Sequence, residues 1–134
     1  LKDGLPVWFG CDVDQSFLQA DGIMDLTSVD ADSLFGFDVD AGFSKADRLD
    51  FGESVMTHAM TIEGVNLDAD GTPSLWKVEN SWGDENGQKG YFVMTDPWFD
   101  EYTFEVVVNK KYLSEDIARL YETEPEVLPY YLPF

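Results

Sequence analysis

The 134-residue sequence has one histidine, one cysteine and few basic residues. A single cysteine, Cys11, cannot form an internal disulfide, so we expect a reducing, cytoplasmic setting. No apolar run approaches the roughly 20 residues needed to cross a bilayer, so we expect no membrane partner. The 8 Lys and Arg residues against 27 Asp and Glu give a net charge of −19. That balance argues against nucleic acid as a partner, because phosphate binding depends on basic side chains.

The composition and the hydrophobic patterning predict one β-rich domain. The chain is 44% hydrophobic and 15% aromatic, which is enough to build a core. Apolar or alternating stretches predict strands at 6–13, 57–65, 75–82, 91–95 and 102–109. Ser44 and Ser114 each precede a short stretch with helix-start signals. The predicted fold class is therefore α+β, mainly antiparallel β, as a barrel-like domain with short peripheral helices.

The only histidine, His58, opens an alternating strand in which it shares a face with Met60 and Ile62. A lone histidine in an apolar strand is more often structural than catalytic. Its neighbours do not activate it, since Glu53 is five residues away and Glu63 should point to the other face. If His58 is a base, some other group has to orient its imidazole ring.

Asn80 is a candidate for that group. It follows Trp76 and Val78 on the inward face of the next strand and precedes Trp82. A buried amide costs free energy unless it is hydrogen-bonded, and its oxygen can accept from an imidazole N–H. Adjacent antiparallel strands can bring His58 and Asn80 together, with Trp82 keeping water off their bond. A triad would then need a nucleophile.

The sequence offers no convincing nucleophile. Cys11 lies within a predicted strand and beside Asp12, whereas a catalytic thiolate favours partial exposure and a positive neighbour. Ser54, Thr57 and Ser81 lack the sharp turn that presents a nucleophilic hydroxyl. We therefore interpret Cys11 as a buried, inert cysteine.

Several D-x-D pairs invite a test for metal binding. They are Asp12/Asp14, Asp30/Asp32, Asp38/Asp40 and Asp68/Asp70. An EF-hand loop that starts at Asp68 would have Pro73 at its sixth position, where the sharp turn requires Gly, and its final ligand Glu79 would lie on a strand. We therefore expect neither a metal nor a cofactor.

Two stretches together resemble a known family. "MTHAMTIEGV" followed by "WKVENSWGDENGQKGYFVMT" resembles the His and Asn half of a papain-like cysteine peptidase. "PVWFGCDV", "LDFGESVMTHAMT", "KGYFVMTDPWFDEYTFEVVVNKKYL" and "LYETEPEVLP" narrow the resemblance to the bleomycin hydrolase and aminopeptidase C branch. The resemblance extends over residues 6–129.

The resemblance implies roles for three residues. His58 would be the general base, Asn80 its orienting group, and Trp82 the shield of the bond between them. Cys11 matches a strand cysteine of that branch and not its nucleophile. The nucleophilic Cys and the oxyanion-hole Gln of such peptidases lie in an N-terminal domain without a counterpart here.

The expected organisation follows from the same resemblance. Residues 1–134 would be a single C-terminal β-domain cut from a longer chain, with 14–50 an insertion-like excursion and 123–134 an extended tail. On its own this domain is expected to be inactive. The complete protein is expected to be a cytoplasmic aminopeptidase C-like cysteine peptidase that acts on peptide substrates and assembles as a homo-oligomer, a hexamer by resemblance.

Two alternatives remain open at this point. The tail "EVLPYYLPF" departs from the branch after Pro129 and ends in aromatic residues, which leaves an endopeptidase of the same branch as one alternative. The other is a non-catalytic binding module that retains the fold, because a fold does not guarantee an activity.

Overall fold

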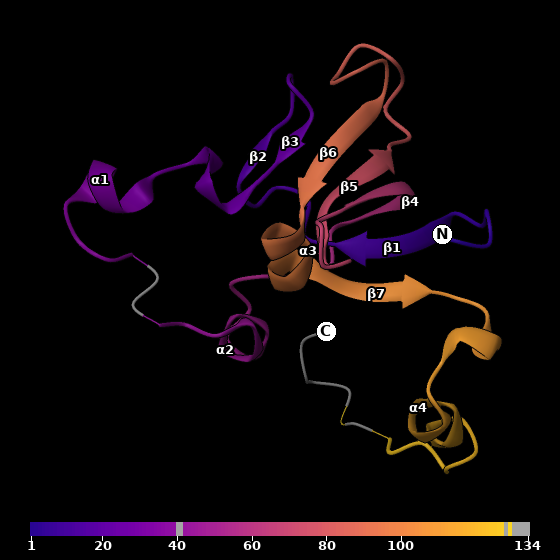
Figure 1. Cartoon of the computed structure of the whole chain (residues 1–134). Helices are drawn as coiled ribbons and strands as arrows, with labels where there is room; N and C mark the ends of the chain where they lie inside the picture. The colour runs from indigo at the N-terminus through magenta and orange to yellow at the C-terminus, as the bar shows by residue number, and fades with distance from the viewer. Residues whose placement is uncertain (40–41, 128, 130–134) are drawn as a thin grey trace.

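A computed structural model describes residues 1–39, 42–127 and 129. Their elements are β1 Val7–Cys11, β2 Phe17–Leu18, β3 Ile23–Met24, the 3₁₀ helix η1 Leu26–Ser28, α1 Ala31–Phe35, α2 Lys45–Asp50, β4 His58–Leu67, β5 Pro73–Glu79, β6 Tyr91–Thr95, α3 Asp96–Tyr102, β7 Thr103–Val107, the 3₁₀ helix η2 Lys110–Tyr112 and α4 Glu115–Leu120. A curved sheet forms the centre of the molecule, and the helices lie at its periphery (Figure 1). The predicted α+β, mainly antiparallel fold class is confirmed.

The strands described above form one seven-stranded sheet in the order β2-β3-β6-β5-β4-β1-β7. Every neighbouring pair is antiparallel except β3 and β6, which run parallel. The order is open in the described part of the chain, because no ladder joins the edge strands β2 and β7. The sheet is therefore a curled half-barrel, and β4 and β5 lie near its middle.

Alternation along the strands builds the core. Phe9 and Cys11 of β1 are fully buried and face the same side as their β4 partners. One side of the sheet thus collects the apolar side chains, since successive residues of a strand point to opposite faces. The buried core consists of Phe9, Cys11, Val13, Met24, Met60, Ile62, Val78, Phe92, Met94 and Trp98.

A β-bulge in β4 keeps charged residues on the outer face. The register with β5 shifts between Ile62 and Gly64, which leaves Glu63 as the extra residue. Glu63 forms an ion pair with Lys77 at 3.3 Å on the outer side of the sheet. Glu63 therefore points away from the core, as the alternating pattern predicted.

Both predicted helix starts are confirmed. Ser44 and Asp47 form a reciprocal capping box at the start of α2, in which each side chain bonds the other's backbone N–H. The hydroxyl of Ser114 accepts from the backbone N–H of Ile117 at the start of α4. Local side-chain chemistry therefore sets the first residue of each helix.

Several elements were missed by the sequence patterning, among them two short strands and one helix. The five predicted strands are all present, but the two-residue strands β2 and β3 and the helix α3 were not expected. Alternation cannot reveal a two-residue strand, because it needs several residues to repeat. The aromatic run "PWFDEY" is typical of a strand, yet Pro97 lies in the first turn of α3, where its missing N–H has no helical partner to lose.

The C-terminal tail is only partly described. No helix or strand is present over 123–127 or at 129. The other residues of the predicted extended tail 123–134, namely 128 and 130–134, lie outside the described residues. The boundary of the tail stays a prediction.

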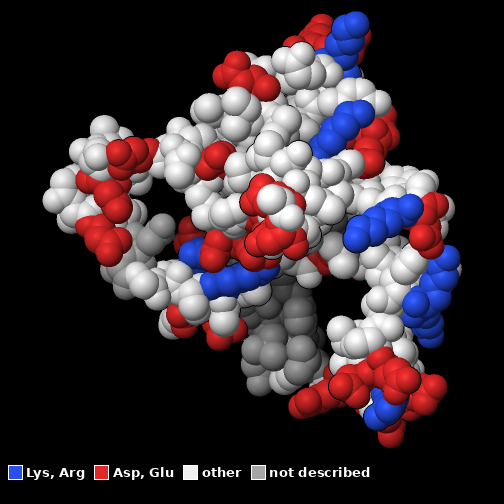
Figure 2. Space-filling view, in the orientation of Figure 1, with Lys and Arg blue, Asp and Glu red and all other residues white. Residues whose placement is uncertain are grey.

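Acidic side chains are spread over the surface of the molecule (Figure 2). In this view they gather over α4 and over the part of the chain that carries α1. The net charge of −19 is thus distributed over several elements and does not form one confined patch.

Trp98 connects α3 to the 14–50 segment through a hydrogen bond to Gln15. Its side chain is fully buried, and its indole N–H donates to the carbonyl of Gln15 at 2.7 Å. We expect Trp98→Phe to lower the free energy of unfolding by about 1–3 kcal/mol, because it leaves the partly buried carbonyl of Gln15 without its donor. Trp98→Ala should cost about 3–5 kcal/mol through loss of packing. Urea denaturation checks both values.

A matched control is Trp8→Phe, since Trp8 is 40% exposed. This change should shift stability by less than about 0.5 kcal/mol. Equal effects of the two Trp→Phe changes would contradict the anchoring role of Trp98.

Candidate active site

His58 and Asn80 meet at one edge of the β4–β5 pair. His58 is the first residue of β4, and Asn80 directly follows β5. The antiparallel register pairs Thr61 with Glu79, so the start of β4 and the end of β5 lie side by side. The distance from His58 Nε2 to Asn80 Oδ1 is 2.9 Å. The structure thus brings together the two residues that the sequence singled out.

The hydrogen bonds of Asn80 define the state of the imidazole. Its Oδ1 also accepts from the backbone N–H of Ser81 at 2.7 Å. A backbone N–H can only donate, so the atom facing it and His58 has to be the amide oxygen. His58 Nε2 therefore carries a proton and donates it to Asn80. In the neutral ring, Nδ1 is then the unprotonated nitrogen and can accept a proton.

The loop after β5 fixes the position of Asn80. The backbone N–H of Asn80 donates to the carbonyl of Gly90 at 3.1 Å. Gly90 has a φ of +85°, and a Cβ at this position would lie 2.7 Å from the carbonyl oxygen of Gly83. Only glycine combines this backbone conformation with so close an approach. The turn at Gly90 thus returns the chain to support Asn80.

The amide nitrogen of Asn80 is buried and has no hydrogen-bond partner among the described residues. Asn80 is 8% exposed, so this unpaired donor costs free energy. The two bonds to the amide oxygen nevertheless hold the side chain in one orientation. The orientation of Asn80 therefore satisfies the amide oxygen and leaves the amide nitrogen unpaired.

Trp82 covers the imidazole ring. The two ring centroids are 4.5 Å apart with an interplanar angle of 33°. Phe17 and Phe92 contact Trp82 in turn, at centroid distances of 6.4 Å and 6.5 Å. Trp82 is itself 39% exposed, so it shields the His58–Asn80 pair from one side while facing solvent on the other. Phe17, on the unexpected strand β2, was not predicted to lie near the site.

Cys11 lies opposite His58 in the β1–β4 register, but its thiol is fully buried. Burial and, secondarily, the negative charge of Asp12 raise the pKa of Cys11 to about 12. A thiol with this pKa is almost entirely protonated at neutral pH and is a poor nucleophile. The burial agrees with the interpretation of Cys11 as an inert cysteine.

The three hydroxyl residues considered as nucleophiles have other contacts. Ser54 is 1% exposed and donates to the carboxylate of Asp12 at 2.8 Å. Thr57 donates to the same carboxylate at 3.2 Å. Ser81 contributes its backbone N–H to Asn80. No hydroxyl of the described residues is hydrogen-bonded to His58.

The acidic stretch 68–72 forms the turn between β4 and β5. The backbone N–H of Asp68 donates to the carbonyl of Thr72, and the carboxylate of Asp70 accepts from the Thr72 N–H at 3.0 Å. Over residues 1–39, 42–127 and 129 no group of three or more His, Cys, Asp and Glu side chains is placed to hold a metal. A search of the same residues found no helix of sufficient length and hydrophobicity to cross a membrane.

Asp12 is the residue near the site that sequence reasoning missed. The sequence presented it only as part of a D-x-D pair and as a neighbour of Cys11. In the structure its side chain is 4% exposed and accepts hydrogen bonds from the segment that precedes His58. The available signal was its place within the predicted buried strand 6–13, where a carboxylate needs donors.

Comparison with known proteins places this geometry in a family. The whole chain, residues 1–134, matches the model of the Peptidase C1-like family. The chain therefore belongs to the Peptidase C1-like family, and the resemblance found in the sequence is confirmed.

Three relatives show which branch is similar. Aminopeptidase C of Lactococcus lactis subsp. cremoris is 52% identical over 128 residues, which cover 96% of this chain and 29% of that protein. Bleomycin hydrolase of Homo sapiens is 47% identical over 135 residues, or 99% of this chain and 30% of that protein. The crystal structure of PepW from Lactobacillus rhamnosis HN001 has a TM-score of 0.89 and 48% identity, covering 98% of this chain and 30% of that one. The chain thus spans about 30% of the length of its relatives.

The raised pKa of Cys11 gives a direct test of its inertness. At pH 8 its thiolate fraction is on the order of 10⁻⁴ if the pKa is about 12. We expect no reaction with iodoacetamide in the folded chain and full reaction in urea, measured by intact mass. Because the folded thiol keeps its proton above its ordinary pKa of 9.0, this group also lowers stability as the pH rises from 9 toward 12. Rapid labelling of the folded chain at pH 8 would contradict the assignment.

Proposed function

We propose that this chain supplies the base and the orienting amide of a cysteine peptidase. His58 is the general base and Asn80 holds its ring, while the nucleophilic thiol comes from a part of a longer protein outside these 134 residues. The observation that carries the proposal is the 2.9 Å bond between His58 Nε2 and Asn80 Oδ1. Membership of the Peptidase C1-like family supports it.

The proposed mechanism follows from the protonation state of the ring. Nδ1 of His58 takes the proton of the thiol, which gives a thiolate and an imidazolium. The thiolate attacks the carbonyl carbon of the scissile peptide bond, and the imidazolium returns the proton to the leaving amine. In the second half, His58 removes a proton from water, and the resulting hydroxide releases the acyl group from sulfur. Asn80 accepts from the Nε2 proton throughout and keeps the ring in one orientation.

Cys11 does not serve as the thiol in this proposal. Its side chain is fully buried and its pKa is raised to about 12, so it forms no thiolate at neutral pH. The 134-residue chain alone should therefore show no peptidase activity. This assignment makes the isolated chain a natural negative control for the experiments below.

The two site residues should contribute unequally in the complete protein. We expect His58→Ala to lower kcat by about 10³-fold or more, because no group remains to move the proton. Asn80→Ala should lower kcat by about 10- to 150-fold, the equivalent of one charge-assisted hydrogen bond. Steady-state hydrolysis of a fluorogenic aminoacyl amide measures both values.

Asn66→Ala is a matched control. Asn66 is an exposed residue on the same strand as His58, and its amide donates to the Ser74 hydroxyl instead of contacting a ring nitrogen. The kcat of the Asn66→Ala variant should equal that of the unchanged complete protein. Near-normal turnover by His58→Ala would overturn the proposed function.

We further propose that the complete protein is an aminopeptidase. Support comes from aminopeptidase C proteins of 49–52% identity over 96% of this chain. An aminopeptidase requires a free N-terminal ammonium on its substrate. The complete protein should therefore hydrolyse an aminoacyl amide at least 100-fold faster than the same compound with an acetylated amine, a difference on the order of 3 kcal/mol for an unpaired buried charge partner. Comparable rates on internally labelled, N-acetylated peptides would instead indicate an endopeptidase.

A further inference from the structure

The segment that precedes β4 determines where His58 lies. Residues 51–57 run from the end of α2 to the start of β4 without forming a helix or strand. His58 pairs with Cys11 in the β1–β4 ladder, and the backbone N–H of Thr57 donates to the Cys11 carbonyl at 3.0 Å. A shift of this segment would therefore move the backbone of His58 directly.

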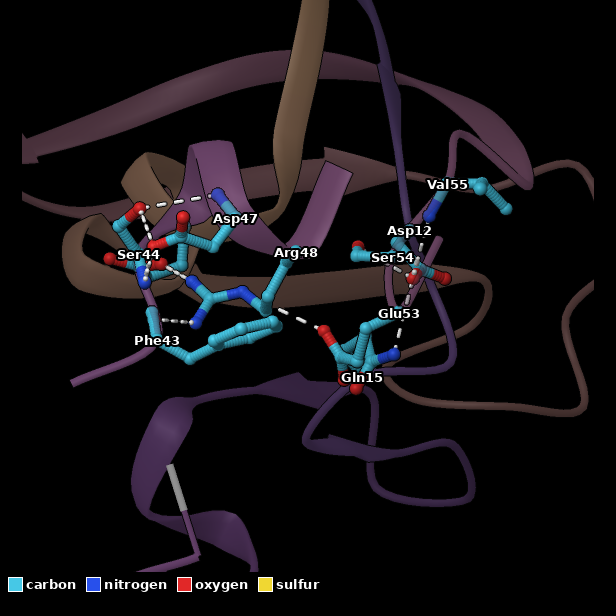
Figure 3. Close-up of polar contacts among 10 residues, drawn as sticks. Asp12, Gln15, Phe43, Ser44, Asp47, Arg48, Glu53, Ser54 and Val55 are labelled. Atoms are coloured by element: carbon cyan, nitrogen blue, oxygen red, sulfur yellow. Dashed lines mark hydrogen bonds and ion pairs between the residues drawn. The ribbon is translucent and has the colours of Figure 1, made fainter. Parts of the chain in front are cut away.

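The carboxylate of Asp12 binds this segment at three points. Its Oδ2 accepts from the Ser54 hydroxyl at 2.8 Å and from the Val55 backbone N–H at 3.4 Å. Its Oδ1 accepts from the Thr57 hydroxyl at 3.2 Å. A further bond to Oδ2, from Gln15 Nε2 at 3.2 Å, holds the carboxylate itself (Figure 3).

The Thr57 hydroxyl is bonded on both sides. It donates to Asp12 and accepts from the backbone N–H of Val13 at 3.1 Å. Both bonds connect the residue before His58 to the residues that follow β1. The orientation of this hydroxyl is therefore fixed, and Thr57 cannot rotate without losing a bond to a buried group.

Arg48 anchors the other end of the same segment. Its backbone carbonyl accepts from the N–H groups of Glu53 and Ser54, at 2.9 Å and 3.2 Å. Its guanidinium is 8% exposed, donates to the Phe43 carbonyl at 2.9 Å and forms an ion pair with Glu101 of α3. Figure 3 shows the guanidinium of Arg48 on the side of Phe43 and Asp47, and Asp12 beside Ser54 and Val55. The segment is thus held at both ends.

Asp12 is a buried acidic residue whose hydrogen-bond partners are all uncharged. A buried carboxylate costs free energy, and its partners here are neutral hydroxyl, amide and backbone donors. A neutral side chain such as Asn offers one acceptor oxygen and two donors, so it could not receive all four of these bonds. The position therefore requires a group that accepts from several donors at once.

We propose that Asp12 is a positioning residue for His58. By binding Ser54, Val55 and Thr57, its carboxylate fixes the start of β4 and thereby keeps His58 Nε2 at hydrogen-bond distance from Asn80. Asp12 acts only through this segment and does not touch the reacting atoms. The importance of this role for catalysis rests on the proposed function, but the geometric effect does not.

The proposal can be tested on the His58 ring itself. The chain contains one histidine, so a ¹⁵N-filtered proton spectrum holds a single imidazole set. The Nε2–H signal is visible when its bond to Asn80 protects it from exchange with water. We expect Thr57→Val, which removes the hydroxyl between Asp12 and the segment, to broaden or abolish this signal. Thr57→Ser retains the hydroxyl and should retain the signal.

A core variant separates positioning from general stability. Met94 is a fully buried residue of β6 and makes no contact with the Asp12 carboxylate among the bonds described above. Met94→Ala should lower the melting temperature and leave the Nε2–H signal sharp. If Thr57→Val does not fold, Ser54→Ala removes a single donor to Asp12 and is judged by the same spectrum. A sharp signal in Thr57→Val or, where that variant does not fold, in Ser54→Ala, or an equal loss of the signal in Met94→Ala, would overturn the proposal.

Kinetics in the complete protein then test the consequence for catalysis. Thr57→Val should lower kcat by about 10- to 100-fold with KM unchanged, as expected for a misplaced base, and Thr57→Ser should restore kcat. A rise in KM at constant kcat would contradict a positioning role. The His58→Ala variant decides the proposed function separately, because the ring signal does not depend on turnover.

Discussion

The hydrogen bond between His58 Nε2 and Asn80 Oδ1 is the interaction on which the organisation of the site depends. It joins the start of one strand to the end of the next, and the β4–β5 register makes the two ends neighbours. The N–H of Ser81 fixes which atom of the amide faces the ring. That single assignment decides which ring nitrogen carries the proton and which one can receive another. The protonation state of the His58 ring thus follows from the backbone N–H of Ser81, which bonds Asn80 and not the ring itself.

The surroundings of this bond determine its strength. A hydrogen bond exposed to water contributes little, because water competes for both partners. Here Asn80 is 8% exposed and Trp82 lies against the imidazole, so the bond is partly withdrawn from solvent. Low local polarity strengthens an existing bond and penalises an unpaired group. The unpaired amide nitrogen of Asn80 carries that penalty, and the two hydrogen bonds of the amide oxygen offset it.

The sequence predicted much of the fold, for identifiable reasons. The five longer strands follow from apolar and alternating patterns, and the starts of α2 and α4 follow from Ser44 and Ser114. The short strands β2 and β3 exist because β3 pairs with β6 and β2 pairs with β3, and such a tertiary effect leaves no local pattern. Helix α3 was missed because its aromatic residues favour a strand, while burial of Trp98 against the core favours the helix.

For the site, sequence patterns identified the residues but could not establish their contacts. His58, Asn80 and Trp82 were recognisable from strand position and spacing, and the structure brings the three together. The contribution of Asp12 was not recognisable, because its partners Ser54 and Thr57 lie more than 40 positions further along the chain. Nothing near Asp12 in the sequence indicates that Ser54 and Thr57 will meet it.

Asp12 also bears on why the chain's own thiol does not compete for the base. Cys11 and His58 are direct partners in the β1–β4 ladder, so a reactive Cys11 would lie beside the imidazole. Burial and, to a lesser extent, the neighbouring carboxylate of Asp12 together raise the pKa of Cys11 to about 12. The same charge that binds the segment before His58 therefore helps to keep the adjacent thiol protonated. Replacing Asp12 by a neutral residue would weaken both effects at once, which gives this position two reasons to retain a carboxylate.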